Sequence, residues 1–203
     1  SAFVTGPDQV VGVAMEQDNW QIVAAHLGIL KAGGTVLFLD TTLPDALVSH
    51  MLADALPVVV LTRGQEHFRG LPTLDLLALP EAETGRTQPA WLDDPRERLA
   101  CIFYTSGTTG HPKGVVYSHR STWLHSQAAC TSNALGVGHD DTVLAIVPMF
   151  HANAWGLPYA AMMAGAQLLL PDRFLQAAPL VEMIEAVRPT MAGAVPTIWT
   201  DVL

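Results

Sequence analysis

Two short apolar stretches enclose one helical pattern near the start of the chain, and this alternation restricts the fold more than any other feature. Val10–Met15 and Thr35–Leu39 are typical of buried strands. Between them, Asp18 and Gln21 have the spacing of a capping box, and Gly33 marks a helix end. The apolar residues of this predicted helix recur at helical spacing: Trp20, Val23, Leu27 and Leu30. The pattern predicts a βαβ unit, in which the two strands are parallel.

The same alternation continues along the chain. Further strands are predicted at 58–61, 99–104, 114–117, 142–147, 167–170 and 191–195, and further helices at 44–53, 121–135, 153–164, 180–187 and from 197 onward. Pro, Gly, Thr, Asp and Arg dominate residues 80–98, where the apolar period is lost. We therefore predict an α/β fold with mostly parallel sheets covered by helices, in two βαβ-type subdomains, 1–79 and 99–203, joined by a linker at 80–98.

Composition excludes several classes of protein. Half of the 203 residues are hydrophobic and only 14% are charged, which is the reverse of a disordered chain. A net charge of −9 without a basic run argues against nucleic acid as a partner. The uncharged stretch 142–170 is interrupted by proline and glycine, so it predicts buried strands and a helix rather than a membrane span. No signal segment is visible, and two cysteines fit a reducing compartment, so we predict a cytoplasmic location.

Tyr104–Gly114, which reads YTSGTTGHPKG, directly follows a predicted buried strand. Its glycines let backbone N–H groups approach a ligand closely, and its hydroxyls offer further hydrogen bonds. Lys113 adds a positive charge suited to phosphate. The segment therefore predicts a polyphosphate site rather than a flexible turn. Its spacing is not that of a Walker A loop, and the chain contains neither GxGxxG nor GxSxG.

Tyr104–His119 resembles, almost throughout, the phosphate-binding signature of the adenylate-forming superfamily, which includes acyl-CoA synthetases, nonribosomal adenylation domains and luciferases. Leu30–Gly34 (LKAGG) is similar to the LKAG motif of that family. Pro148–Trp155 (PMFHANAW) resembles its fourth core motif, in the form found in medium- and long-chain fatty acyl-CoA synthetases. The resemblance covers essentially the whole chain, and it implies the α/β fold of the family's N-terminal domain.

The resemblance also implies an acid–thiol ligase that uses ATP, Mg²⁺ and CoA. A carboxylate would first form an acyl-adenylate, from which CoA then displaces AMP. Lys113 and His151 are the expected catalytic residues, and Thr105 is the expected Mg²⁺ ligand. His151 and Trp155 are expected to contact the acyl substrate. The expected contacts of the nucleotide phosphates are Thr105, Ser106, Gly107, Thr108, Thr109, Gly110 and Lys113.

Other motifs of the superfamily do not occur in these 203 residues. They are the Tyr-Gly-x-Thr-Glu segment, the ribose-binding Thr-Gly-Asp segment and a C-terminal lysine. We therefore expect an inactive fragment of the N-terminal domain, without the C-terminal domain. Two other functions stay open: an acyl-AMP ligase or adenylation domain that loads a carrier protein, and a non-catalytic nucleotide-binding module. The expected partners are small molecules, and a homodimer is one of the oligomeric states left open.

Overall fold

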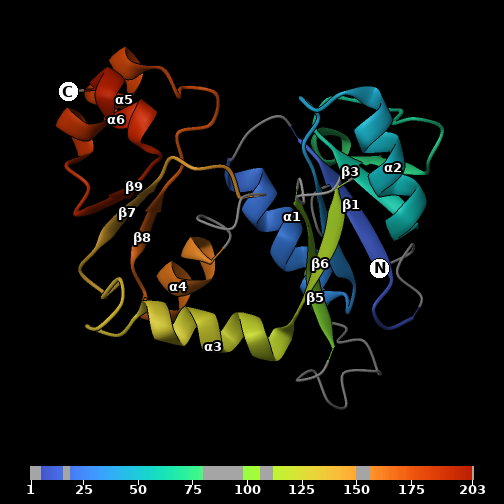
Figure 1. Ribbon diagram of the computed structural model, residues 1–203, viewed down its shortest axis with the longest axis horizontal. Coiled ribbons are helices and arrows are strands. Elements are labelled where there is room, and N and C mark those ends of the chain that lie inside the picture. The colour runs from blue at the N-terminus through green and yellow to red at the C-terminus, as the bar shows by residue number, and fades with distance from the viewer. Residues whose placement is uncertain (1–5, 16–18, 80–97, 106–111, 150–155, 203) are drawn as a thin grey trace. The chain divides into compact units, whose positions relative to one another are not determined.

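The chain forms two compact units, seen here in a computed structural model (Figure 1). The first comprises residues up to 16 and 21–120, and the second comprises residues 17–20 and 121–203. The structure describes residues 6–15, 19–79, 98–105, 112–149 and 156–202. The strands are β1 (Val10–Ala14), β2 (Thr35–Leu39), β3 (Val59–Thr62), β4 (Thr73–Asp75), β5 (Leu99–Thr105), β6 (Lys113–Ser118), β7 (Thr142–Ala145), β8 (Gln167–Leu169) and β9 (Met191–Gly193). The helices are α1 (Trp20–Lys31), α2 (Asp45–Ala55), the short 3-10 turn η1 (Leu76–Ala78), α3 (His119–Ala129), α4 (Leu157–Ala164), α5 (Ala177–Val187) and α6 (Pro196–Val202).

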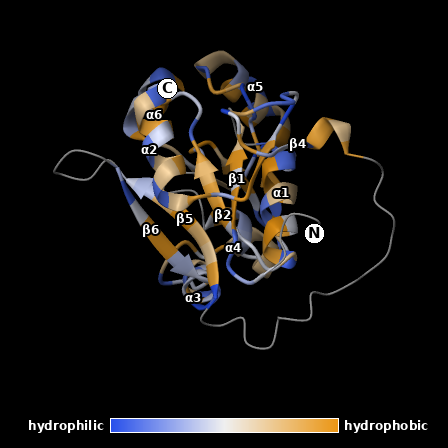
Figure 2. Cartoon of the chain, turned by 90° about the vertical axis from the view of Figure 1, so that its right-hand side faces the viewer, coloured by the Kyte–Doolittle hydropathy of each residue, from blue (hydrophilic) through white to orange (hydrophobic). Residues whose placement is uncertain are grey.

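The described part of the first unit holds a six-stranded sheet in the order β4-β3-β1-β2-β5-β6. All neighbouring strands are parallel except β5 and β6, which form an antiparallel hairpin. β1 pairs with β2 from Val10 opposite Thr35 to Ala14 opposite Leu39, which confirms the predicted βαβ unit. Figure 2 shows the central strands of this sheet as strongly hydrophobic, as expected for parallel strands covered on both faces.

The two helices of the first unit cover opposite faces of the sheet (Figure 1). Alternate residues of β2 point to opposite faces, because the side-chain period of a strand is two. Leu37 and Leu39 pack in a cluster with Val48 and Met51 of α2. On the other face, Phe38 contacts the ring of His26 from α1, with ring centroids 5.0 Å apart. The predicted α/β fold, with a mostly parallel sheet and helices on its faces, is therefore confirmed.

The buried face of α1 differs from the face that its apolar spacing marks. Trp20 is 68% exposed and Leu27 is 37% exposed, although both belong to the apolar residues that recur at helical spacing. The buried residues of the helix are Ile22, Ala25, His26 and Ile29. These residues also follow helical spacing, but His26 interrupts their apolar pattern in the sequence. The structure shows His26 packed edge-on against Phe38, so an aromatic contact takes the place of an aliphatic one.

The compact units do not divide at residues 80–98, where the subdomain boundary was expected. β5 pairs with β2 through Val36 opposite Cys101 and Leu37 opposite Ile102. The residues on either side of 80–97 therefore belong to one hydrogen-bonded sheet. The division falls after Arg120 instead, at the beginning of α3. A change in composition marks a connection between elements, but strand pairing decides which elements share a core.

The described part of the second unit contains a parallel three-stranded sheet, in the order β8-β7-β9. One face of β7 packs Val143 and Ala145 against Leu157 and Ala160 of α4. The opposite face packs Leu144 against Leu180 of α5. The expected strand–helix–strand order within 142–170 is thus confirmed by β7, α4 and β8. Across the residues that the structure describes, no helix combines the length and the apolar character needed to cross a bilayer.

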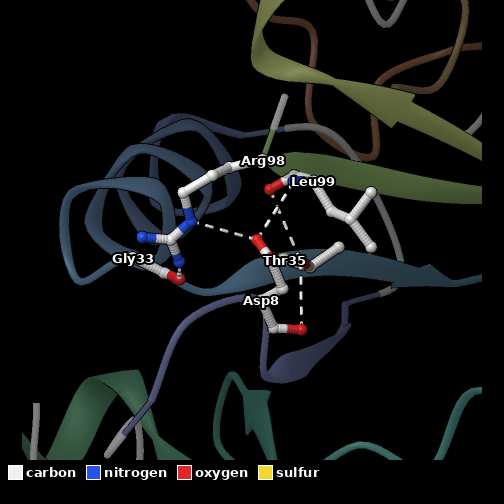
Figure 3. Close-up of polar contacts among 5 residues, drawn as sticks. All are labelled: Asp8, Gly33, Thr35, Arg98 and Leu99. Carbon is white, nitrogen blue, oxygen red and sulfur yellow. Dashed lines mark hydrogen bonds and ion pairs between the residues drawn. The ribbon is translucent and has the colours of Figure 1, made fainter. Parts of the chain in front are cut away.

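A polar network ties together the amino ends of three strands in the first unit (Figure 3). Arg98 Nε donates to Asp8 Oδ1 at 3.2 Å, and the Leu99 amide donates to the same oxygen at 3.1 Å. A terminal nitrogen of Arg98 donates to the Gly33 carbonyl at 2.8 Å. The Thr35 hydroxyl lies 3.3 Å from the Asp8 carbonyl oxygen. The network thereby fixes where β1, β2 and β5 begin.

Replacing Arg98 by alanine is expected to lower the free energy of unfolding by about 1–2 kcal/mol. The Arg98 side chain is only 11% exposed, so its ion pair is less screened than an ordinary surface pair. Chemical denaturation of the wild-type and variant proteins measures the difference. Arg173→Ala is the matched control, because Arg173 lies outside this network, over the ring of Phe174. Equal losses in the two variants would contradict a special role for the network.

Candidate functional site

The hairpin of β5 and β6 brings together two of the predicted site residues. Thr105 ends β5 and Lys113 begins β6, and the two are direct partners in the antiparallel register. Both residues are exposed. The connection between them contains Ser106, Gly107, Thr108, Thr109 and Gly110, which lie outside the described residues. The structure therefore places the two ends of the predicted phosphate-binding segment and confirms that it joins two paired strands.

The location of Thr105 agrees with the usual place of ligands in α/β proteins. β5 is parallel to β2, so Thr105 lies at the carboxyl edge of the parallel strands. Ligands of open α/β sheets bind outside that edge. Asp40 follows β2 at the same edge, and its Oδ1 accepts hydrogen bonds from the amide and the hydroxyl of Thr42, at 2.9 and 2.6 Å. The Asp8–Arg98 network lies at the opposite, amino edge (Figure 3).

The glycine directly beside Lys113 lies close to an aromatic ring. Gly114 is paired with Tyr104, and a Cβ atom added to Gly114 would lie 3.3 Å from Cζ of the tyrosine ring. Most Cβ contacts are longer, so a larger residue would require the tyrosine ring to shift by a few tenths of an ångström. The ring of Tyr104 can therefore lie across β6. This packing explains the glycine after the lysine by local geometry, independently of any ligand.

The Tyr104 hydroxyl reaches from this hairpin to α2. It donates to Asp54 Oδ2 at 2.6 Å, and the Met51 carbonyl oxygen lies 3.5 Å away. Burial raises the pKa of Tyr104, and the hydrogen bond to Asp54 and the charge of that carboxylate raise it further. The tyrosine therefore remains a protonated donor throughout the neutral pH range. Asp54 itself is exposed.

The other end of the segment also contacts α2. His50 Nε2 lies 3.1 Å from the carbonyl oxygen of Pro112, the residue before β6. A carbonyl oxygen only accepts, so the imidazole donates through Nε2–H. Neither His50 nor Asp54 belongs to a motif that the sequence displays. Asp54 and Tyr104 are 50 residues apart and His50 and Pro112 are 62 apart, and nothing in the spacing of the chain connects them.

Thr105 and Lys113 have the chemistry that a magnesium–polyphosphate group requires. A hydroxyl oxygen is the hard ligand that Mg²⁺ prefers, and the ion usually keeps several waters. The lysine ammonium donates to phosphate oxygens as a mobile point charge. Among the described residues, no three His, Cys, Asp or Glu side chains gather into a metal-binding group. The assignment of Mg²⁺ to Thr105 stays a prediction.

The second unit carries the other predicted residues. His151 and Trp155 lie outside the described residues, but both flanks of their segment are placed. Met149 is 1% exposed in the core after β7, and Gly156 is buried at the start of α4. A Cβ atom added to Gly156 would lie 2.2 Å from the ring of His125 in α3, so this close approach also needs a glycine. His125 thus packs against the flank of the motif.

Comparison with known proteins places this chain among adenylate-forming enzymes. Residues 3–203 match the family described as AMP-binding enzyme. A 3-methylmercaptopropionyl-CoA ligase of Ruegeria lacuscaerulensis is 43% identical over 178 residues, which cover 86% of this chain and 33% of that protein. A long-chain-fatty-acid–CoA ligase of Thermus thermophilus is 52% identical over 104 residues, which cover 51% of this chain and 19% of that protein. This chain thus spans a third or less of the length of these relatives.

The fold is likewise that of known adenylate-forming proteins. The inhibitor-bound crystal structure of the N-terminal domain of FACL13 from Mycobacterium tuberculosis superimposes with a TM-score of 0.79. The two sequences are 28% identical, and the match covers 97% of this chain and 52% of that one. The resemblance that the motifs indicated therefore extends over the whole α/β fold.

Proposed function

This chain belongs to the AMP-binding enzyme family, and we propose that at its natural length the protein converts a fatty acid into its CoA thioester at the expense of ATP. The observation that carries the proposal is the pairing of Thr105 with Lys113 at the carboxyl edge of the sheet, at the two ends of the YTSGTTGHPKG segment. A hydroxyl and an ammonium at one point of the sheet suit the phosphates of a nucleotide.

In the proposed reaction, a carboxylate oxygen of the acid attacks the α-phosphorus of ATP. The bond from the α-phosphorus to the bridging oxygen breaks, and pyrophosphate leaves with that electron pair. The thiolate of CoA then attacks the acyl carbon, and the bond to AMP breaks. Lys113 and the hydroxyls of the segment hold the β- and γ-phosphates, where negative charge develops in the first step. Mg²⁺, when bound, neutralises phosphate charge, and Thr105 would hold it.

His151 and Trp155 are proposed to act on the acyl side of the reaction. The imidazole would orient the carboxylate or the adenylate phosphate by a hydrogen bond. The indole would form a wall of the passage for the acyl chain. The support for a fatty acid is the HANAW sequence at 151–155, together with the name of the Thermus relative. The name of the Ruegeria relative makes a short sulfur-containing acid the competing substrate.

The test is a product assay on the natural-length protein. The protein is incubated with MgATP, CoA and a series of saturated acids from four to eighteen carbons, with 3-methylmercaptopropionate in parallel, and thioesters and adenylates are separated by chromatography. Acyl-CoA from the medium or long acids is the expected product. Acyl-AMP without thioester would instead support an adenylating enzyme that loads a carrier protein. Thioester from 3-methylmercaptopropionate alone would overturn the fatty acid, and no product at all would favour a non-catalytic binding module.

Trp155→Ala is expected to change acyl selectivity more than ATP affinity. Removing the indole enlarges the proposed passage, so KM for the acid and the preferred chain length shift, whereas KM for ATP stays within about twofold. The chain-length series on the variant measures this shift. If Trp155 instead packs only in the core, the variant loses about 3–5 kcal/mol of stability and keeps the chain-length profile of the wild type. Thermal melting of the same preparation distinguishes the two results.

A further inference from the structure

Both ends of the predicted phosphate-binding segment are held by one helix. Tyr104, next to the end of β5, donates to Asp54 at 2.6 Å. Pro112, just before β6, accepts a hydrogen bond from His50 at 3.1 Å. His50 and Asp54 are four residues apart on α2 and therefore lie on the same side of the helix. Tyr104 and Pro112 are eight residues apart in the chain, yet both contact the same turn of α2.

The helix itself is fixed to the sheet. Val48 and Met51 of α2 are 0% and 2% exposed and belong to the core cluster that includes Leu37 and Leu39. His50 and Asp54 extend from this buried base toward the hairpin. Gly114 completes the arrangement, because its missing side chain lets the Tyr104 ring lie close to β6. The side chains that contact the hairpin ends therefore come from a helix that is packed in the core.

We propose that His50 and Asp54 are positioning residues for the nucleotide-binding step. By holding Tyr104 and Pro112, α2 fixes the position of the paired strand ends, and with it the place where Thr105 and Lys113 meet the phosphates. The proposal rests on the proposed function, since it assigns to these residues a part in the same site. Neither residue is proposed to touch ATP.

A role in global stability is the competing explanation, and the exposure of Asp54 argues against it for the contact with Tyr104. Asp54 is exposed, and hydrogen bonds at exposed carboxylates contribute little to the free energy of unfolding because solvent screens them. The local effect is different. Losing either contact removes one link between α2 and the paired strands that carry Thr105 and Lys113. The cost then appears in nucleotide affinity, because binding has to restore the position of these two residues.

The experiment uses the natural-length protein with a set of paired variants. Tyr104→Phe removes the donor and keeps the ring, and Asp54→Ala removes the acceptor. His50→Ala removes the second contact. Asp54→Asn and His50→Gln are the conservative variants, since the first keeps an acceptor and the second keeps an N–H donor. Asp45→Ala is the matched control, because it removes an equal charge from α2 but breaks only the pair with Arg69.

Two readouts separate positioning from stability. Isothermal calorimetry with MgATP, without acid or CoA, gives the nucleotide affinity. Steady-state kinetics gives KM for ATP, for the acid and for CoA. We expect Tyr104→Phe, Asp54→Ala and His50→Ala each to weaken MgATP binding by about three- to tenfold, the range of one ordinary hydrogen bond. The double variant of Tyr104 and Asp54 should be no worse than the more severe single one, because both remove the same bond. KM for CoA should stay within twofold.

The conservative variants and the control complete the test. Asp54→Asn and His50→Gln should restore most of the affinity, and Asp45→Ala should bind MgATP as the wild type does. The inference is overturned if the three disruptive variants bind MgATP like the wild type. It is also overturned if they only lower the melting temperature and shift all three KM values together. A wild-type protein that binds MgATP with this pattern but forms no acyl-CoA would refute the proposed function and support the positioning role. A wild type that binds no MgATP would refute both.

Discussion

Lys113→Ala is expected to lower kcat/KM for the ATP-dependent step by about ten- to a hundredfold. Lys113 lies at the start of β6, directly opposite Thr105, and is exposed at the edge of the sheet where ligands of α/β proteins bind. A hydrogen bond from an ammonium to a phosphate contributes about 1.5–3 kcal/mol, which corresponds to that range of rates. Removing the ammonium leaves the strand pairing of the hairpin unchanged, since that pairing uses only backbone atoms.

The two half-reactions separate a phosphate contact from a general loss of activity. Pyrophosphate release with saturating acid reports adenylation, and thioester formation from synthetic acyl-adenylate and CoA reports the second step. The variant should be slow in the first assay and nearly normal in the second, because the β- and γ-phosphates have left by then. Lys31→Ala is a matched control, since Lys31 is exposed in the last turn of α1. Equal losses in both half-reactions would count against the phosphate role of Lys113.

The structure shows which parts of this architecture a single sequence can predict. β1 and β2 were predictable because each is a continuous apolar run, and α1 was predictable from its helical spacing and from Gly33 at its end, which the structure places at a positive φ of 83°. Thr105 and Lys113 were predictable as members of one phosphate-binding segment because its glycines, hydroxyl residues and lysine follow directly on a buried strand. These are local signals, carried by residues that are neighbours in the chain.

The features that were missed depend on contacts between distant parts of the chain. Asp54 and His50 acquire their significance only when α2 packs beside the hairpin of β5 and β6. β4 has only three residues, and it forms because β3 offers a free edge through Val60, Leu61 and Thr62. The apolar spacing in the sequence did not identify the buried face of α1, for a related reason. A histidine reads as polar in a sequence, whereas packing against Phe38 decides that this one is buried.

His26 should also make the protein sensitive to acid, which is the second large effect that we expect. Its side chain is 2% exposed, and burial lowers its pKa from 6.5 to about 3, with a smaller contribution from His119. His119 is half-buried, and burial together with the charge of Arg98 lowers its pKa as well, against the opposing influence of Asp8. The folded protein therefore keeps His26 neutral, beside Phe38, at pH values where the unfolded chain already binds a proton.

The sign of the effect follows from proton linkage. Between pH 6.5 and about 3 the unfolded state holds more protons at this residue than the folded state, so acid favours unfolding. The stabilisation is complete above pH 6.5 and decreases as the pH falls through this window. A pKa of about 3 in the folded state against 6.5 in the unfolded state corresponds to an upper limit of about 5 kcal/mol, of which about 2 kcal/mol should already be lost at pH 5.

Urea denaturation of the natural-length protein at several pH values from 7.5 to 4.5 measures this loss. His26→Phe keeps a ring against Phe38 but cannot bind a proton, so its stability should fall less steeply with acid than that of the wild type. The difference between the two curves isolates His26 from the carboxylates, which titrate in both proteins. His139→Phe is the control, because its side chain is 83% exposed and should leave the slope unchanged. Parallel curves for wild type and His26→Phe would mean that the buried imidazole accepts a proton without unfolding the core, and the assignment of acid sensitivity to His26 would then be wrong.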